Sequence, residues 1–166
     1  MKSELISEQI LSDDEISIDC SEINSSVDSI LTKKLKEKLE GNCITSGYVM
    51  KDSIELINRS KYGECYKGKT RYNISFKTRL VSPVVGLNIE CYINSITKAG
   101  VVAYIKLDDY GNYEGNKFED SPLLILIPLN RFEGKNIQEN TKINVEITAF
   151  RIMKNNKTIQ VIGRPI

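Results

Sequence analysis

The chain has 166 residues, of which 40% are hydrophobic and 27% charged, with a net charge of +1, a composition typical of a globular protein with one ordinary domain or two small ones. It contains no histidine and no G-x-S-x-G, G-x-x-x-x-G-K-[ST] or G-x-G-x-x-G motif, which argues against the common catalytic triads, zinc sites and nucleotide-binding loops. No apolar run approaches the roughly 20 residues of a membrane-spanning helix and the N-terminus lacks a secretion-signal pattern, so we expect a chain that is not an enzyme and has no cofactor, metal or membrane contact.

Charge is distributed unevenly along the chain. Residues 1–22 carry seven acids and one base, whereas residues 23–85 carry 12 bases and six acids. The polar and acidic composition of residues 1–13 predicts a loosely held extension. The basic surplus that follows suits an acidic protein surface or a phosphate backbone, although a solvated basic face explains it equally well.

A strand and a helix are expected next. The segment "DEISIDC" (14–20) alternates apolar and polar side chains, as half-buried strands do. Ser25 and Asp28 form a capping-box start, and apolar side chains then recur every four residues until Gly41. This pattern predicts a helix whose apolar face lies on a sheet.

Strand-like runs complete the first half of the chain. They cover residues 42–59 and 70–83, and the turn-rich segment "SKYGECYKGK" (60–69) connects them. We therefore predict that residues 14–83 form a small α+β domain.

The four cysteines are widely spaced and include no C-x-x-C pair; they are Cys20, Cys43, Cys65 and Cys91. Structural zinc sites need closely spaced cysteine or histidine ligands. We interpret these cysteines as buried thiols in a reducing compartment rather than as zinc ligands or disulfides.

The second half of the chain, residues 84–166, shows only strand patterns. Two alternating runs flank "TKAG" (97–100), and a long polar insert, "DDYGNYEGNKFEDSP" (108–122), separates them from the apolar run "LLILIPLN" (123–130). Two further strands follow around the turn "MKNNK" (153–157). Five strands with a mobile loop after the second predict a small closed barrel of the OB-fold type.

Four segments in order resemble one known family. They are "LEGNC" at the end of the helix, "Y-x-I-x-F-K" from Tyr72 to Lys77, "G-x-x-I-x-C-x-I-x-x-I-x-K-x-G" from Gly86 to Gly100, and the closing "FRIMKNNKTIQVIG". Over roughly residues 14–166 the chain resembles the stalk subunit of multisubunit DNA-dependent RNA polymerases, which is the seventh subunit of RNA polymerase II and its archaeal counterpart.

The resemblance implies an α+β N-terminal tip domain followed by an all-β OB-fold barrel domain. It implies a non-catalytic subunit that docks on the polymerase core subunits near the clamp and guides nascent RNA in transcription. A smaller stalk subunit is the other implied partner, and the catalytic site would lie on other subunits. The implied location is the nucleus or cytoplasm.

Alternation along the barrel strands assigns candidate RNA-binding residues. Side chains of Ile89, Cys91 and Ile93, and opposite them Val101, Ala103 and Ile105, are expected to point into the barrel. Aromatic and basic side chains on the outer surface would then stack on bases and contact phosphates. These candidates are Tyr92, Lys98, Tyr104, Lys106, Arg131, Arg151 and Lys154. Alternatively, the two tyrosines pack against the insert or the smaller stalk subunit.

A second group of candidates would dock the tip domain on the polymerase core. Aromatic and basic side chains gather around one expected sheet edge, where a loop could enter a groove of an acidic surface. The candidates are Tyr62, Tyr66, Lys67, Lys69, Arg71, Lys77 and Arg79. Lysine-rich edges also prevent strands from aggregating, which is the competing interpretation.

A different class of function remains open. A free-standing OB-fold RNA-binding protein would share the same barrel, and an accessory domain that only bridges proteins is a third hypothesis. The chain contains 23 Ile and 14 Asn but only three Ala, a bias expected of an AT-rich genome. Together with the acidic N-terminus, this bias suggests a large DNA virus as the source, with the subunit carried in the virion.

Overall fold

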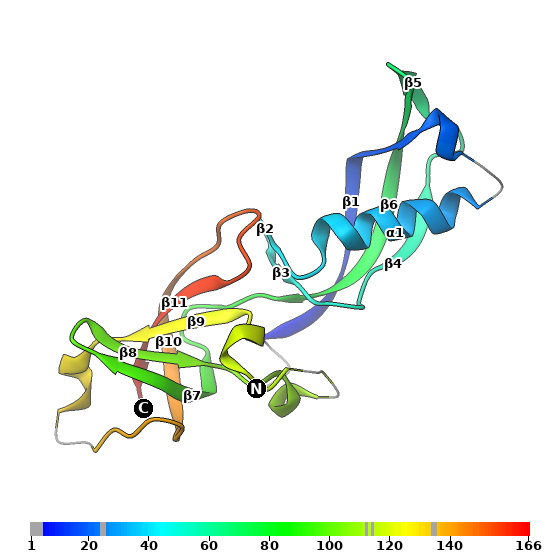
Figure 1. Ribbon diagram of the computed structural model, residues 1–166. Coiled ribbons are helices and arrows are strands. Elements are labelled where there is room, and N and C mark those ends of the chain that lie inside the picture. The colour runs from blue at the N-terminus through cyan, green and yellow to red at the C-terminus, as the bar shows by residue number, and fades with distance from the viewer. Residues whose placement is uncertain (1–4, 24–25, 112, 114, 134–135) are drawn as a thin grey trace. The chain divides into compact units, whose positions relative to one another are not determined.

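The computed structural model describes residues 5–23, 26–111, 113, 115–133 and 136–166 (Figure 1). Contacts within the chain divide it into two compact units. The helix-sheet unit comprises Glu8–Asn42 and Val49–Leu80, and the barrel unit comprises the residues up to Ser7, Cys43–Tyr48 and Val81–Ile166. Each unit has its own buried apolar side chains.

The helix-sheet unit is built around one long strand, β6 (Lys69–Val81). This strand is hydrogen-bonded to β1 (Ile6–Asp19), β4 (Glu55–Arg59) and β5 (Glu64–Tyr66). The helix α1 (Val27–Leu39) lies over one face of the sheet (Figure 1). A short 3₁₀ turn, η2 (Cys20–Glu22), follows β1.

The predicted helix is confirmed, and its buried face is the predicted one. Leu31 and Leu35 of the helix are fully buried, and Ile74 and Phe76 of the sheet are each only 2% exposed. Ser25 lies outside the described residues, and the helix begins after Ser26, which makes no side-chain capping hydrogen bond. α1 has 13 residues, and in the described part of the chain no helix is long and apolar enough to cross a membrane.

Two expectations about this unit are corrected. β1 begins at Ile6 rather than at residue 14, because the 13-residue β6 offers backbone partners along a longer strand. The segment expected to be only a connection contains β5, which forms a hairpin with β6. Lys67 and Gly68 both have positive φ and connect the paired residues Tyr66 and Lys69, a geometry suited to a two-residue hairpin turn.

The barrel unit contains a closed five-stranded barrel, as predicted. Its strands are β7 (Asn88–Thr97), β8 (Gly100–Tyr104), β9 (Leu123–Ile127), β10 (Lys142–Arg151) and β11 (Ile159–Pro165). They follow the order β10-β11-β9-β8-β7, and pairing between β10 and β7 closes the barrel. Only the pair of β9 and β11 is parallel, and the arrangement is compatible with an OB-fold.

The predicted inward side chains are all buried. Ile89, Cys91 and Ile93 of β7, and Val101 and Ala103 of the neighbouring strand β8, are at most 4% exposed. Ile105, directly after β8, is fully buried. The apolar run of β9 is buried on one face only. Ile125 is fully buried, whereas Leu126 is 37% exposed, because a barrel strand has one outer face.

β2 (Cys43–Ile44) and β3 (Gly47–Val49) follow α1 in the chain and pair as a small antiparallel hairpin. Other short elements connect the barrel strands. The insert between β8 and β9 contains the 3₁₀ turns η3 (Leu107–Tyr110) and η4 (Phe118–Asp120), and η5 (Leu129–Phe132) follows β9. The described part of the insert is thus folded rather than a featureless loop.

The cysteine interpretation holds for two residues and is wrong for two. All four thiols are free; Cys43 and Cys91 are buried, whereas Cys20 and Cys65 are exposed. Both exposed thiols approach the Thr70 hydroxyl, with Sγ–Oγ1 distances of 3.6 Å and 3.4 Å. They lie at the end of β1 and in β5, at the tip of the sheet, where the hydrophobic core does not reach.

Candidate functional site

The two candidate stacking residues of the barrel lie side by side. Tyr92 of β7 pairs with Tyr104 of β8 in the sheet register, and their ring centroids are 6.0 Å apart. Tyr104 also contacts Phe118 of η4, edge to face, at 5.8 Å. Although it points outward from the barrel, Tyr104 is only 8% exposed. The insert therefore covers the aromatic face that sequence reasoning assigned to RNA, and the alternative prediction that the two tyrosines pack against the insert is confirmed.

Tyr92 makes polar contacts through both its hydroxyl group and its ring. Its hydroxyl donates a 2.7 Å hydrogen bond to Oδ2 of Asp109, and this bond, reinforced by desolvation, raises the pKa of Tyr92. The ammonium group of Lys106 lies 4.2 Å from the ring centroid, within the range of a cation–π interaction. Tyr92 is thus held by the insert rather than free to rotate toward a base.

Acids balance the bases around the aromatic pair. Lys142 forms a 2.9 Å ion pair with Glu90, and this contact raises the pKa of Lys142. The Tyr110 hydroxyl donates a hydrogen bond to the backbone oxygen of Glu90 at 3.3 Å. Because Glu90 and Asp109 accompany Lys106 and Lys142, this cluster has little net positive charge to attract phosphate.

The structure brings three of the RNA-binding candidates together and leaves four apart. Tyr92, Tyr104 and Lys106 share the aromatic cluster. The other four are exposed and lie on other elements: Lys98 in the β7–β8 turn, Arg131 in η5, Arg151 at the end of β10 and Lys154 in the β10–β11 turn. Sequence reasoning named neither Asp109 nor Phe118, and the available signal was the three aromatic residues of the polar insert, Tyr110, Tyr113 and Phe118.

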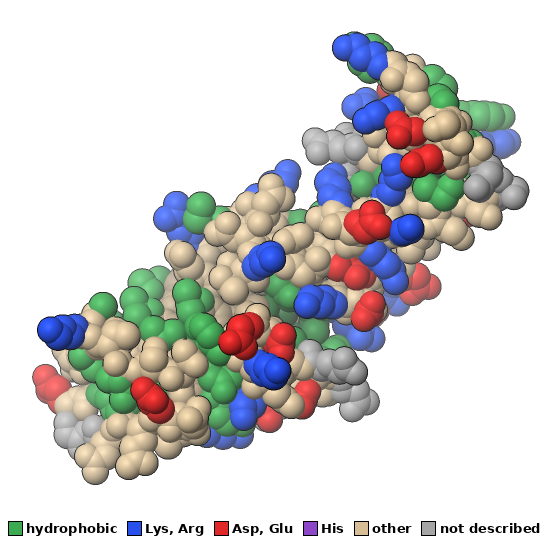
Figure 2. Space-filling view, viewed as in Figure 1, with side chains coloured by type: hydrophobic (Ala, Val, Ile, Leu, Met, Phe, Trp, Pro, Cys, Tyr) green, Lys and Arg blue, Asp and Glu red, His purple; other side chains and the backbone are tan. Residues whose placement is uncertain are grey.

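Beside the aromatic cluster, the outer face of the barrel forms an apolar groove. It has a volume of about 440 Å³ and runs across β8, β9, β11 and β10. Hydrophobic side chains gather over the barrel in Figure 2, at the lower left. The groove is lined by Val102, Leu124, Leu126, Ala149, Phe150, Arg151, Gln160 and Ile162, together with Ile125 and Val161. Only Arg151 was a candidate from the sequence.

Four of the predicted docking residues line one shallow hollow at the tip of the helix-sheet unit. They are Tyr66, Lys67, Lys69 and Arg71, joined by Ser17, Glu64 and Cys65. Tyr66 is 73% exposed, and the ammonium group of Lys67 lies 5.3 Å from its ring centroid. Arg71 forms a 3.4 Å ion pair with Glu64. The hollow is therefore aromatic and basic, with one acid.

The remaining docking candidates lie outside this hollow. Tyr62 precedes β5, is 79% exposed and has the Lys61 ammonium 5.6 Å from its ring. Lys77 forms a 3.1 Å ion pair with Glu8 of β1, and Arg79 lies farther along β6. Lys77 thus stabilises the pairing of two strands and is less available to a partner than Tyr62.

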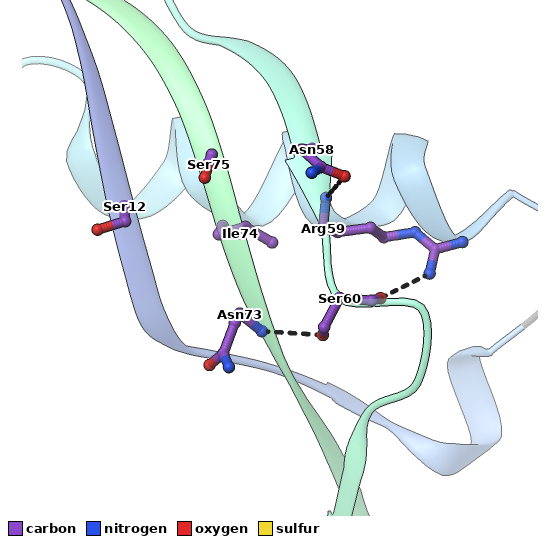
Figure 3. A pocket seen from close by; sticks show the side chains of 7 residues that line it. All are labelled: Ser12, Asn58, Arg59, Ser60, Asn73, Ile74 and Ser75. Atoms are coloured by element: carbon purple, nitrogen blue, oxygen red, sulfur yellow. Dashed lines mark hydrogen bonds between the residues drawn. The ribbon is translucent and has the colours of Figure 1, made fainter.

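A polar pocket of about 470 Å³ opens between β1, β4 and β6. Figure 3 shows Asn58, Arg59 and Ser60 on one side, Asn73, Ile74 and Ser75 on the other, and Ser12 on β1. The backbone N–H of Asn73 donates to Oγ of Ser60 at 3.2 Å, and the Arg59 guanidinium donates to the Ser60 carbonyl and to Asp28. Because these groups bond to one another, the pocket supports the local fold rather than presenting a converging set of ligand-binding groups.

No family model matches this chain, and no curated protein sequence is similar to it.

Proposed function

We propose that this chain is a non-catalytic stalk subunit of a DNA-dependent RNA polymerase. Its tip, residues 14–83, would dock on the polymerase core near the clamp, and its barrel would guide nascent RNA. The observation that carries the proposal is the closed barrel compatible with an OB-fold, found in the segment to which the resemblance assigns one. The ordered motifs from "LEGNC" to "FRIMKNNKTIQVIG" support it independently.

The exposed aromatic and basic side chains at the tip suit the docking role. Tyr62 and Tyr66 are the most exposed large hydrophobic side chains at this end of the sheet, and aromatic residues are the usual anchors of protein interfaces. Lys67, Lys69 and Arg71 around Tyr66 would complement an acidic core surface.

The docking role is tested by affinity purification of the tagged full chain from its native extract. We expect the large polymerase subunits to be recovered, and their recovery to fall when Tyr62→Ala and Tyr66→Ala are combined. Ile57→Ala is the matched control, because Ile57 is an exposed apolar residue of the same unit, on β4. Recovery of ribosomes, or no loss with the tyrosine variants, would contradict the proposal.

The alternative is a free-standing RNA-binding protein with the same barrel. Its RNA would bind without any polymerase subunit, and the aromatic pair Tyr92 and Tyr104 would be the stacking platform. The insert that covers Tyr104 argues against this reading, because a platform for continuous use is expected to be open. Crosslinking of RNA to the isolated chain, lost when both tyrosines are replaced by alanine, would favour the alternative.

A further inference from the structure

We propose that the apolar groove on the outer face of the barrel is a docking site for an amphipathic helix with acidic flanks in a partner protein. The groove is formed by side chains of the barrel alone, and this docking role is independent of the polymerase assignment.

Register places apolar side chains in neighbouring rows across the strands. Val102 of β8 pairs with Leu126 of β9, and Leu126 pairs with Ile162 of β11. Leu126 is 37% exposed and Ile162 is 46% exposed. Leu124, one row along, pairs with Gln160. Aliphatic residues that face outward together on three neighbouring strands form a continuous patch, and such patches mark interaction surfaces.

The fourth strand extends the patch to its basic end. β10 pairs with β11 through Ala149, Phe150 and Arg151, after a register shift that follows Ile147. Phe150 is 39% exposed and lines the groove. An aromatic side chain at the margin of an aliphatic groove supplies the large contact area that interface anchors need.

The width of the groove fits a helix. Four adjacent strands span three interstrand gaps, or about 14 Å at the usual spacing. An α-helix with its side chains is about 10–12 Å across. A single helix laid along the patch would therefore cover most of that width, with apolar side chains at positions i, i+3, i+4 and i+7 facing the groove.

The charge of the barrel around the groove indicates which residues should flank the apolar stripe of that helix. Residues 147–166 contain Arg151, Lys154, Lys157 and Arg164 and no acid. Arg164 is paired with Glu146 at 2.6 Å, which leaves three bases around the end of the β10–β11 hairpin. Acidic residues beside the apolar stripe of the partner would complement them.

The lining favours protein over RNA. Bases bind through stacking platforms and hydrogen bonds, whereas this groove offers one aromatic ring, one amide side chain and otherwise mainly aliphatic surface. The aromatic cluster beside it is covered by the insert through Phe118. The open half of the outer face is therefore the half least suited to nucleotide bases.

The test uses synthetic helical peptides and the full chain, with binding followed by fluorescence anisotropy. One peptide carries an apolar stripe with glutamate flanks, a second has lysine flanks, and a third has the first composition in scrambled order. We expect the glutamate peptide to bind more tightly than the other two. Ile162→Ser is expected to weaken that binding about tenfold, because it replaces an exposed aliphatic side chain of the patch by a small polar one.

Ile57→Ser is the matched control, because Ile57 is 49% exposed in the helix-sheet unit, and it is expected to leave affinity unchanged. Replacing Arg151 and Lys154 together by glutamate is expected to reverse the preference toward the lysine peptide. Equal binding of the scrambled peptide, or no binding at millimolar concentrations, would overturn the proposal. So would oligouridylate binding that Ile162→Ser weakens as strongly, which would assign the groove to RNA.

Discussion

The two halves of the barrel's outer face differ in what covers them. On one half, Tyr92 and Tyr104 are held by Asp109 and Phe118 of the insert. On the other half, Leu126 and Ile162 are exposed along an apolar groove. The residues most suggestive of binding in the sequence are thus occupied within the chain, and the unoccupied surface is aliphatic. Residue type alone does not identify a free surface, because an insert can supply the partner.

The largest expected effect is the difference in stability between alanine substitutions on the inner and outer faces of β9. Ile125→Ala empties a fully buried site and is expected to lower the free energy of unfolding by about 2–5 kcal/mol. Leu126→Ala, at the next residue on the outer face, is expected to lower it by less than about 1 kcal/mol. Urea unfolding of the full chain measures both, and equal losses would contradict the assignment of faces.

A smaller effect concerns alkaline pH. Burial raises the pKa of Cys91 to about 12, from an ordinary value of 9.0. The unfolded chain therefore loses this proton first, and the contribution of the neutral thiol to stability is complete below pH 9 and lost as pH rises toward 12. The loss is at most about 1.4 kcal/mol for each pH unit in that window.

Cys91→Ala is the control for this titration, and its free energy of unfolding is expected to fall less steeply above pH 9. Parallel pH profiles of the variant and the unchanged protein would show that Cys91 is not held neutral by burial.

The exposed Cys20 and Cys65 offer a second check, because they are expected to react with a thiol reagent before Cys43 and Cys91 do.

The smallest effect tests the insert as a cover. Combining Asp109→Asn with Phe118→Ala removes an acid and exposes the Tyr104 ring, so single-stranded RNA is expected to bind several-fold more tightly. One added stacked base contributes about 1–3 kcal/mol. Replacing Tyr92 and Tyr104 by alanine in the same background is expected to abolish the gain. A gain that survives this replacement would place RNA elsewhere on the chain.

Much of the fold was predictable because it depends on local periodicity. Alternation fixed the inward side chains such as Ile93 and Ala103, and the four-residue spacing of leucines fixed α1. The extension of β1 to Ile6 was missed because its partner strand lies more than fifty residues away in the chain. β5 was missed because its hairpin depends on a positive φ at Lys67, and a lysine in the sequence does not indicate a positive φ.

The candidate sites were harder to predict than the fold. Tyr92 and Tyr104 were correctly placed together on the outer face, since strand alternation determines faces. Their burial depends on contacts with Asp109 and Phe118, which lie in an insert without periodicity. The groove escaped prediction because its rows form only when β8, β9 and β11 are set in register.

Hydroxyl-radical footprinting of the folded full chain, read residue by residue by mass spectrometry, tests this division of the outer face most directly. The account predicts rapid oxidation of Leu126 and Ile162 and strong protection of Tyr104, with the exposed Tyr62 as the internal reference. Oxidation of Tyr104 as fast as that of Tyr62, together with protection of Ile162, would contradict it.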